Sequence, residues 1–218
     1  MNKRIMIAGA TGLVGGRFFS RVVADADCSE VVLLGRRSVP ELEVHEKVTP
    51  LMTDFSDLVE RAPACEVDAV VCALGTTLKK AGSRARLFEV DCLYTVAAAA
   101  YARKCGASAL VVISSVGASP TALSHYLRTK GEMEARVRGL GFQAVHILRP
   151  SLLLGGRDET RFGETFGQRM LSPFSRLIPA RYRPIHADIL AHKIERLVKE
   201  PGEGVSICQG DSLGGDRG

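Results

Sequence analysis

Short apolar runs recur along the chain, separated by longer stretches in which apolar residues return every three or four positions. Nearly every short run is continuously apolar rather than alternating, which is typical of parallel strands covered by helices on both faces. The runs predict strands at Arg4–Ala8, Glu30–Leu34, Val48–Met52, Ala69–Cys72, Ala109–Ile113, Ala144–Leu148 and Val205–Cys208. The helical pattern covers Leu13–Ala24, Ser83–Lys104, Ser124–Leu140 and Ile189–Lys199. This alternation predicts an α/β fold, a Rossmann-type doubly wound parallel sheet.

The residues from Gly155 to Pro184 interrupt the alternation with repeated glycine, proline and phenylalanine. A stretch this long and apolar is unlike a plain loop. We therefore expect residues 155–184 to form small helices, a lid or substrate-side insertion at one end of the sheet. Because 218 residues suit one domain, residues 1–218 are expected to form a single domain.

Composition narrows the class of protein. With 46% hydrophobic and 24% charged residues, the chain resembles an ordinary soluble globular protein. Its net charge of +5 comes from scattered basic residues, which gives no indication of nucleic-acid binding. Its apolar runs are strand-sized, well short of the ~18 residues of a membrane span. Six cysteines without a C-x-x-C or metal-ligand spacing predict reduced thiols, no metal site and a cytoplasmic location.

The chain begins with "RIMIAGATGLVGGRFFS", which combines a basic start with a short apolar run. Glycines interrupt the run too early for a secretion signal, so we interpret it as a strand, a tight turn and a helix. The spacing G-x-x-G-x-x-G lets the backbone turn, approach a pyrophosphate and pack closely, with the helix N-terminus facing the phosphates. The turn therefore predicts dinucleotide binding, with cofactor contacts from Gly9, Thr11, Gly12, Leu13, Val14 and Gly15.

The end of the second strand, "EVVLLGRRS", discriminates between dinucleotides. An acidic residue there would hydrogen-bond the adenosine ribose and select NAD. Here Arg36 and Arg37 follow the strand, and guanidinium groups pair well with a phosphate. The pair favours the 2′-phosphate of NADP(H) as its partner, although two solvated loop arginines are the simpler alternative.

A serine, a tyrosine and a lysine follow the fifth predicted strand in "ISSVGASPTALSHYLRTKGEMEARV". Tyr126 and Lys130 are four residues apart in a helical pattern and so share a face. A lysine ammonium beside a phenol favours the phenolate, which would make Tyr126 a usable acid or base. Ser114 or Ser115, at the carboxyl end of a strand, could hydrogen-bond a reacting carbonyl. The alternative is a partly exposed helix with an ordinary tyrosine and lysine.

These residues belong to motifs that extend over roughly residues 5–190: "GATGLVGGRF", "LLGRR", "CALGTTLKKAGS", "FEVDCLYTVAAAAYARKCG", "VISSVGAS", "YLRTKGEMEARV" and "ILRPSLLLGGR". Together they resemble the short-chain dehydrogenase/reductase superfamily. Within it they are similar to the small atypical NAD(P)H-binding branch of Tat-interacting-protein-like oxidoreductases. The resemblance implies a catalytic set of Ser115, Tyr126 and Lys130, with Ser115 preferred because its neighbouring "SVG" matches best.

The resemblance also implies a path for the cofactor. Asp54 and Phe55 would lie near the adenine; Leu74, Gly75 and Thr76 would line the dinucleotide. The nicotinamide side would be lined by Pro150, Ser151, Leu152 and Leu153, together with Tyr126 and Lys130. Where many relatives have an asparagine, this chain has Asp91, so the family's proton relay is altered.

Two functions remain open from the sequence. The first is an NADP(H)-dependent oxidoreductase that transfers hydride to or from a small carbonyl or alcohol substrate, as a monomer or homodimer. The second is a non-catalytic NADP(H)-binding regulatory or sensor protein that acts through a protein partner. The Tyr126–Lys130 pair favours the enzyme, while Asp91 and the short substrate segment leave the alternative open.

Overall fold

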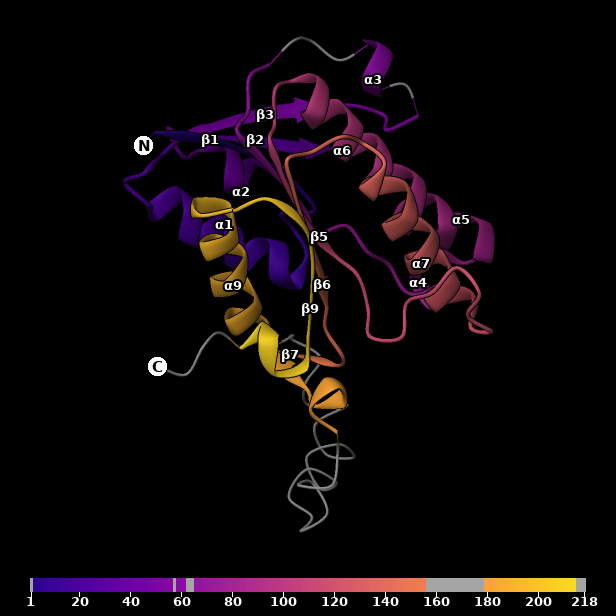
Figure 1. Cartoon of the computed structure of the whole chain (residues 1–218). Coiled ribbons are helices and arrows are strands. Elements are labelled where there is room, and N and C mark those ends of the chain that lie inside the picture. The colour runs from indigo at the N-terminus through magenta and orange to yellow at the C-terminus, as the bar shows by residue number, and fades with distance from the viewer. Residues whose placement is uncertain (1, 57, 62–64, 156–178, 215–218) are drawn as a thin grey trace.

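The computed structural model describes residues 2–56, 58–61, 65–155 and 179–214. Within these ranges, parallel strands form a seven-stranded sheet in the order β3-β2-β1-β4-β5-β6-β9 (Figure 1). The strands are β1 (Lys3–Ala8), β2 (Cys28–Gly35), β3 (Val48–Met52), β4 (Ala69–Cys72), β5 (Ala109–Ile113), β6 (Ala144–Arg149) and β9 (Gly204–Gln209). The predicted doubly wound parallel sheet is confirmed, and each predicted strand is present. β3, β4 and β5 have the predicted bounds, and the other four are slightly longer.

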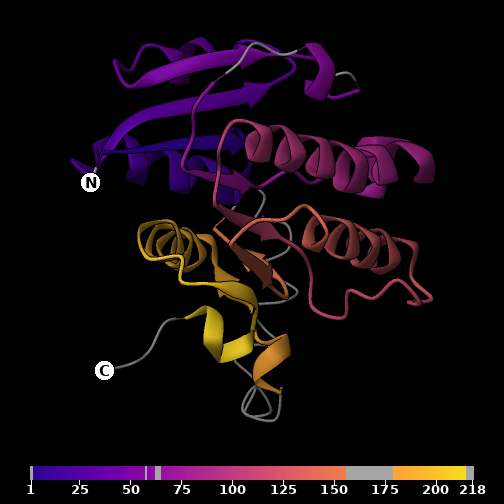
Figure 2. The ribbon, with the colours of Figure 1, turned by 45° about the horizontal axis from the view of Figure 1, so that its top comes forward.

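Helices cover both faces of this sheet (Figure 2). α1 (Leu13–Ala24) and α9 (Ala187–Lys199) lie on one face, and α6 (Tyr94–Lys104) and α7 (His125–Arg138) lie on the other. Strand β1 shows why its sequence is apolar throughout. Ile5 and Ile7 pack in the core beneath α1 and α9, whereas Met6 and Ala8 pack in the core beneath α6 and α7. A central strand buried on both faces has no position for a polar side chain.

The helix predicted over Ser83–Lys104 is present in three joined parts. α5 (Arg84–Phe88) leads into a π-helical turn, η1 (Glu89–Leu93), which continues directly into α6. A π-helical turn inserts an extra residue into a helix and is frequently found at functional sites. Here it contains Asp91, whose side chain is fully buried.

The remaining elements are short, and the apolar pattern did not predict them. They are α2 (Pro40–Glu43), α3 (Leu58–Arg61), α4 (Leu78–Ala81), β7 (Leu153–Leu154), η3 (Ala180–Tyr182), β8 (Ile185–His186) and η4 (Gly210–Leu213). β7 and β8 form a separate two-stranded parallel sheet. They flank the segment predicted as a lid, residues 155–184. Residues 156–178 of that segment lie outside the described residues. None of the helices in the described ranges is long and apolar enough to span a membrane.

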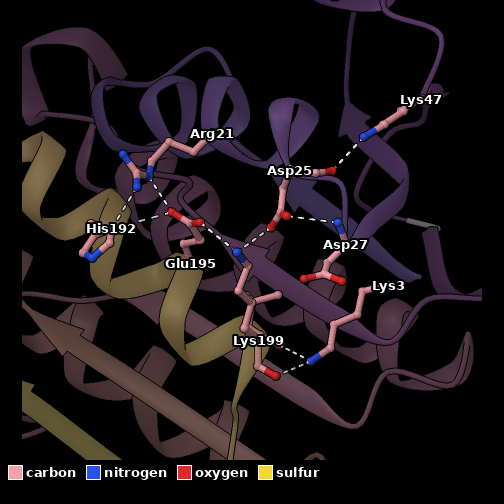
Figure 3. Close-up of polar contacts among 9 residues, drawn as sticks. Lys3, Arg21, Asp25, Asp27, Lys47, His192, Glu195 and Lys199 are labelled. Carbon is pink, nitrogen blue, oxygen red and sulfur yellow. Dashed lines mark hydrogen bonds and ion pairs between the residues drawn. The ribbon is translucent and has the colours of Figure 1, made fainter. Parts of the chain in front are cut away.

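A network of charged side chains joins α9 to α1 (Figure 3). Glu195 accepts a hydrogen bond from Arg21 at 2.6 Å and lies 3.1 Å from the ammonium of Lys199. Lys199 also pairs with Asp25 at 2.8 Å. Lys3 donates to the carbonyls of Val198 and Lys199 at 2.6 and 2.7 Å, which places a cation at the carboxyl end of α9. The network therefore ties the last long helix to the N-terminal half of the sheet.

This network predicts an acid-sensitive stability. The hydrogen bond from Lys199 lowers the pKa of Asp25 below its usual 3.8. Burial alone would raise the pKa of Glu195, but hydrogen bonds from Arg21 and Lys199 outweigh it, so this pKa lies below 4.5. Depressed carboxylate pKa values stabilise the fold above the unfolded-state pKa, and that stabilisation is lost as the pH falls through the folded-state values. We expect Glu195→Gln to cost about 1 kcal/mol at neutral pH.

The free energy of unfolding, measured by urea titration between about pH 7 and pH 3, tests this linkage. The free energy of unfolding of Glu195→Gln should fall less steeply with decreasing pH than that of the wild type, because part of the acid-labile stabilisation is already absent. Glu203→Gln, a change at an exposed site before β9, should keep the wild-type slope. Identical slopes for all three proteins would contradict the role of the network.

Candidate active site

The glycine turn between β1 and α1 packs tightly against the end of β4. Gly9 has φ +95°, and a Cβ there would lie 2.6 Å from the carbonyl of Ala73. A Cβ at Gly15 would overlap the carbonyl oxygen of Gly9. Gly12 is the N-cap of α1 and makes no side-chain cap, so the first-turn N–H groups are directed to a partner from outside the helix. An anion such as a pyrophosphate fits this position.

Beside the turn, a cavity of about 460 Å³ opens at the carboxyl ends of β1, β2 and β3. Its lining contains Gly9, Ala10, Thr11, Leu33, Leu34, Gly35, Arg36, Arg37, Ser38, Val39, Pro40, Glu41, Leu42, Glu43, Pro50, Leu51, Met52, Phe55 and Leu74. Phe55 stacks on Tyr94 with ring centroids 4.9 Å apart. The guanidinium of Arg36 lies over the other ring of this pair, 5.7 Å from the Tyr94 centroid. The cavity lining therefore combines apolar side chains with the guanidinium groups of Arg36 and Arg37, and its Phe55 is stacked on Tyr94.

A second cavity of about 340 Å³ continues along the same edge, and Leu74 lines both. Its lining contains Gly12, Leu13, Val14, Ala73, Leu74, Gly75, Thr76, Thr77, Lys80, Asp91, Ile113, Ser114, Ser115, Tyr126, Lys130, Pro150, Ser151 and Leu153. The two cavities meet where the chain order reverses, between β1 and β4. Ligands of open α/β sheets bind at this kind of switch point.

Tyr126 and Lys130 lie on the first turns of α7 and line the second cavity together with Ser115. Tyr126 is 37% exposed, whereas Lys130 is 3% exposed. The residue after the lysine explains how α7 comes so close. A Cβ on Gly131 would lie 2.4 Å from the backbone nitrogen of Pro120, so only glycine lets the helix contact the loop after β5. The "KG" pair in the sequence was a signal for this contact.

Asp91 reaches Lys130 from the π-helical turn. Its Oδ1 lies 2.8 Å from the Nζ of Lys130, and its Oδ2 accepts a hydrogen bond from the N–H of Thr76 at 2.9 Å. Lys130 also donates to the carbonyl of Ile113 at 3.2 Å. The carboxylate is 0% exposed. Asp91 therefore neutralises the buried ammonium and ties it to the loop after β4, a role that an asparagine would fill without the charge.

The two serines at the end of β5 differ in burial and in hydrogen bonding. Ser114 is buried and donates a hydrogen bond of 2.5 Å to Glu134. Glu134 is also held by Arg149, which donates two hydrogen bonds of 2.9 and 2.6 Å and whose own pKa is raised by them. Ser115 is half-buried, and its hydroxyl makes a long contact of 3.5 Å to the carbonyl of Val116. The hydroxyl of Ser115 is thus the one available to a ligand.

Most of the residues predicted from the sequence line one of the two cavities. Gly15, Asp54 and Leu152 line neither. Gly15 packs against Gly9, Asp54 accepts a hydrogen bond from the N–H of Ser56, and Leu152 is 39% exposed. Tyr94 beneath Arg36 and Thr77 in the second cavity were not predicted from the sequence. Of the two lysines in "CALGTTLKK" that could face an anionic substrate, Lys80 lines the second cavity.

Comparison with known proteins agrees with this geometry. A family model described as NAD(P)H-binding matches residues 9–172. The chain belongs to this family. Among curated proteins, it is 33% identical over 205 residues to Protein HTATIP2 of Rattus norvegicus, covering 93% of this chain and 84% of the relative. It is 34% identical over 167 residues to Protein fmp52, mitochondrial, of Aspergillus clavatus, covering 73% of this chain and 70% of that protein.

Solved structures show the same fold at low identity. The enzyme WbmH of Bordetella bronchiseptica, solved in complex with NAD+, has a TM-score of 0.70 and 19% identity, with 95% of this chain and 75% of WbmH covered. A putative NAD-dependent epimerase/dehydratase from Bacillus halodurans has a TM-score of 0.66 and 20% identity, with 96% and 94% covered. The NAD(P)H-binding family of the resemblance is thus confirmed by the family model and the curated relatives, and these structures confirm the Rossmann-type fold.

The predicted cytoplasmic location is wrong on these comparisons. Fungal relatives from Aspergillus clavatus and Lodderomyces elongisporus, 34% and 31% identical, are named as mitochondrial proteins. The prediction depended on cysteine usage, which reports on the redox state of a compartment and does not distinguish one reducing compartment from another.

Proposed function

We propose that this protein is an NADP(H)-dependent oxidoreductase that acts on a small carbonyl or alcohol substrate. The observation that supports this most is the meeting of Ser115, Tyr126 and Lys130 in one cavity, directly beside the glycine turn. A proton donor, a hydroxyl that can bind the reacting oxygen and a cation then face the same space. A site built only to hold a dinucleotide would not need the first two.

Each residue has a role that follows from its position. When bound, a nicotinamide cofactor supplies or accepts the hydride. Ser115 hydrogen-bonds the substrate oxygen, Tyr126 gives that oxygen its proton, and Lys130 holds positive charge beside the phenol. The turn at Gly12 binds the pyrophosphate at the N-terminus of α1. The volume of about 340 Å³ must also hold the nicotinamide, so the substrate is small.

A screen of aldehydes and ketones, following the absorbance of NADPH, tests the proposal. Conversion of at least one small carbonyl compound, at a rate that depends on Tyr126, would support it. A second candidate function, a non-catalytic NADP(H)-binding protein that acts through a protein partner, is favoured by the ion pair between Lys130 and Asp91. That pair reduces the charge that Tyr126 experiences. Tight NADPH binding with no turnover across the screen would favour this second function.

We expect the protein to bind NADPH more tightly than NADH, because Arg36 and Arg37 border the cavity for the adenosine. Replacing both with alanine should weaken NADPH binding by about 2–3 kcal/mol, which lies within the range of about 1.5–3 kcal/mol for a hydrogen bond to a charged group. NADH binding should change much less. Fluorescence titration of both cofactors with both proteins measures the preference.

Arg196→Ala is a suitable control, because Arg196 is exposed on α9, away from both cavities. It should leave both affinities unchanged. Equal affinity of the wild type for NADPH and NADH would refute the assignment of the arginines, and NAD+ would then be as good a cofactor as NADP+.

A further inference from the structure

Two cysteine thiols lie unusually close together outside the cavities. All six cysteines are free in the structure, yet the sulfurs of Cys65 and Cys105 are only 2.7 Å apart. Two carbon atoms that are not bonded pack best at ~3.5–4.0 Å, and sulfur is larger than carbon. A disulfide bond measures ~2.05 Å. The pair is therefore already close to bonding distance while both thiols are reduced.

The backbone holds this pair in place. The N–H of Val67, two residues after Cys65, donates to the carbonyl of Cys105 at 3.0 Å. The N–H of Cys105 in turn donates to the carbonyl of Tyr101 at 2.9 Å, which anchors it to the end of α6. The phenol of Tyr101, buried in the core, hydrogen-bonds with both thiols. Backbone hydrogen bonds thus hold the segment before β4 against the residue that ends α6, and they bring the two cysteines together.

The two sulfurs differ in accessibility. Cys105 is 7% exposed, whereas Cys65 is half-buried and so is the more accessible of the two. Burial, followed by the contact with Cys105, raises the pKa of Cys65 to about 11. The reactive thiolate is therefore scarce at neutral pH, so oxidation should be slow there and faster in alkaline solution.

We propose that Cys65 and Cys105 are a site of intramolecular disulfide formation, driven by a small disulfide oxidant such as oxidised glutathione. The Cys65 thiolate attacks one sulfur of the oxidant, its S–S bond breaks, and one glutathione leaves as a thiolate. The Cys105 thiolate then attacks the Cys65 sulfur of the mixed disulfide and displaces the second glutathione. The two protein thiols lose two electrons and two protons, and one oxidised glutathione becomes two reduced ones.

The position of the bond indicates its effect. Cys65 precedes β4 and Cys105 follows α6, whereas the cavity residues lie after the opposite, carboxyl end of β4. The bond closes the loop that contains β4 and Asp91, and a closed loop restricts the unfolded chain. Oxidation should therefore raise the melting temperature by roughly 5–15 °C, from the usual range of disulfide stabilisation and the thermal response of a chain this size. NADPH affinity should stay unchanged.

The test uses the full chain, equilibrated with glutathione mixtures from fully reduced to fully oxidised and then acid-quenched. After denaturation and alkylation with N-ethylmaleimide, intact mass should show six adducts in the reduced sample and four in the oxidised one, the difference being the two bonded cysteines among the six. Peptide fragmentation should join Cys65 to Cys105 and leave Cys72 alkylated. Six adducts at the most oxidising mixture, a different pair, or a bond between two copies would overturn the proposal.

Three variants distinguish a disulfide between Cys65 and Cys105 from oxidation at other cysteines. Cys65→Ser should keep all of its remaining thiols alkylatable in every mixture, with no rise in melting temperature. Cys105→Ser should stop at the mixed disulfide between Cys65 and glutathione, so four of its five thiols should remain alkylatable and no bond between two protein cysteines should form. Cys208→Ser, which changes a half-buried cysteine of β9, should still form the bond. Loss of two alkylation sites on oxidation in Cys65→Ser, or an oxidised wild type that melts below the reduced one, would count against the proposal.

Discussion

Tyr126→Phe is expected to reduce the turnover of a carbonyl substrate by roughly 10²–10⁴-fold, the range for loss of a general acid. NADPH binding should change little, because the substitution removes one oxygen and keeps the ring. Tyr126, 37% exposed, lines the second cavity with Ser115 and Lys130, and in the proposed function it donates the proton to the substrate oxygen. Steady-state turnover and NADPH titration of the same preparation measure the two effects separately.

Neighbouring substitutions give this prediction its controls. Ser115→Ala should reduce chiefly turnover. Ser114→Ala should lower the free energy of unfolding, because it removes the hydrogen bond to buried Glu134. Lys130→Ala should damage both binding and turnover. Tyr182→Phe changes an exposed tyrosine of η3 that lines neither cavity, and it should leave turnover unchanged. Wild-type turnover in Tyr126→Phe would show that another group donates the proton, and the role assigned to Tyr126 would be wrong.

The sequence predicted the sheet well because the physics of a doubly covered strand is local. Every residue of β4 is buried, so the run Ala69–Cys72 is apolar without interruption and its bounds could be read directly. The glycine turn was equally readable. Gly9 needs a positive φ and Gly15 needs the absence of a Cβ, and both requirements are imposed by the immediate neighbours of the turn in the fold.

The sequence did not reveal the contacts between residues that are far apart in the chain. Tyr94 stacks on Phe55, a residue of the first cavity, although the two are far apart in the sequence, and no local pattern marks them as partners. The resemblance already favoured Ser115 over Ser114, but it did not reveal that Glu134 of α7, itself held by Arg149 of β6, binds Ser114. Sequence spacing likewise placed Asp91 on a helix but did not show that a π-helical turn directs it to Lys130.

The buried ion pair of Asp91 and Lys130 leads to the second large effect. Both side chains are almost fully buried and their charged atoms lie 2.8 Å apart. Removing one partner of such a pair leaves an uncompensated charge in the core, which costs about 3–5 kcal/mol. We therefore expect Asp91→Ala to lower the free energy of unfolding by that amount. Asp91→Asn should cost less, because an amide oxygen can still accept the hydrogen bond from Thr76.

A double-mutant cycle distinguishes the ion pair from a simple loss of packing. Asp91→Ala combined with Lys130→Met should be more stable than Asp91→Ala alone, because the second change removes the charge that the first left unpaired. Glu132→Ala is the matched control on α7. Its carboxylate lies 3.9 Å from Arg136 on the surface, where loss of a pair costs about 0.5 kcal/mol. Urea unfolding at neutral pH measures the wild type, Asp91→Ala, Lys130→Met, the double variant and Glu132→Ala. If Asp91→Ala were no less stable than Glu132→Ala, Asp91 would not be the counter-charge of Lys130, and the ammonium would need a different partner in the folded protein.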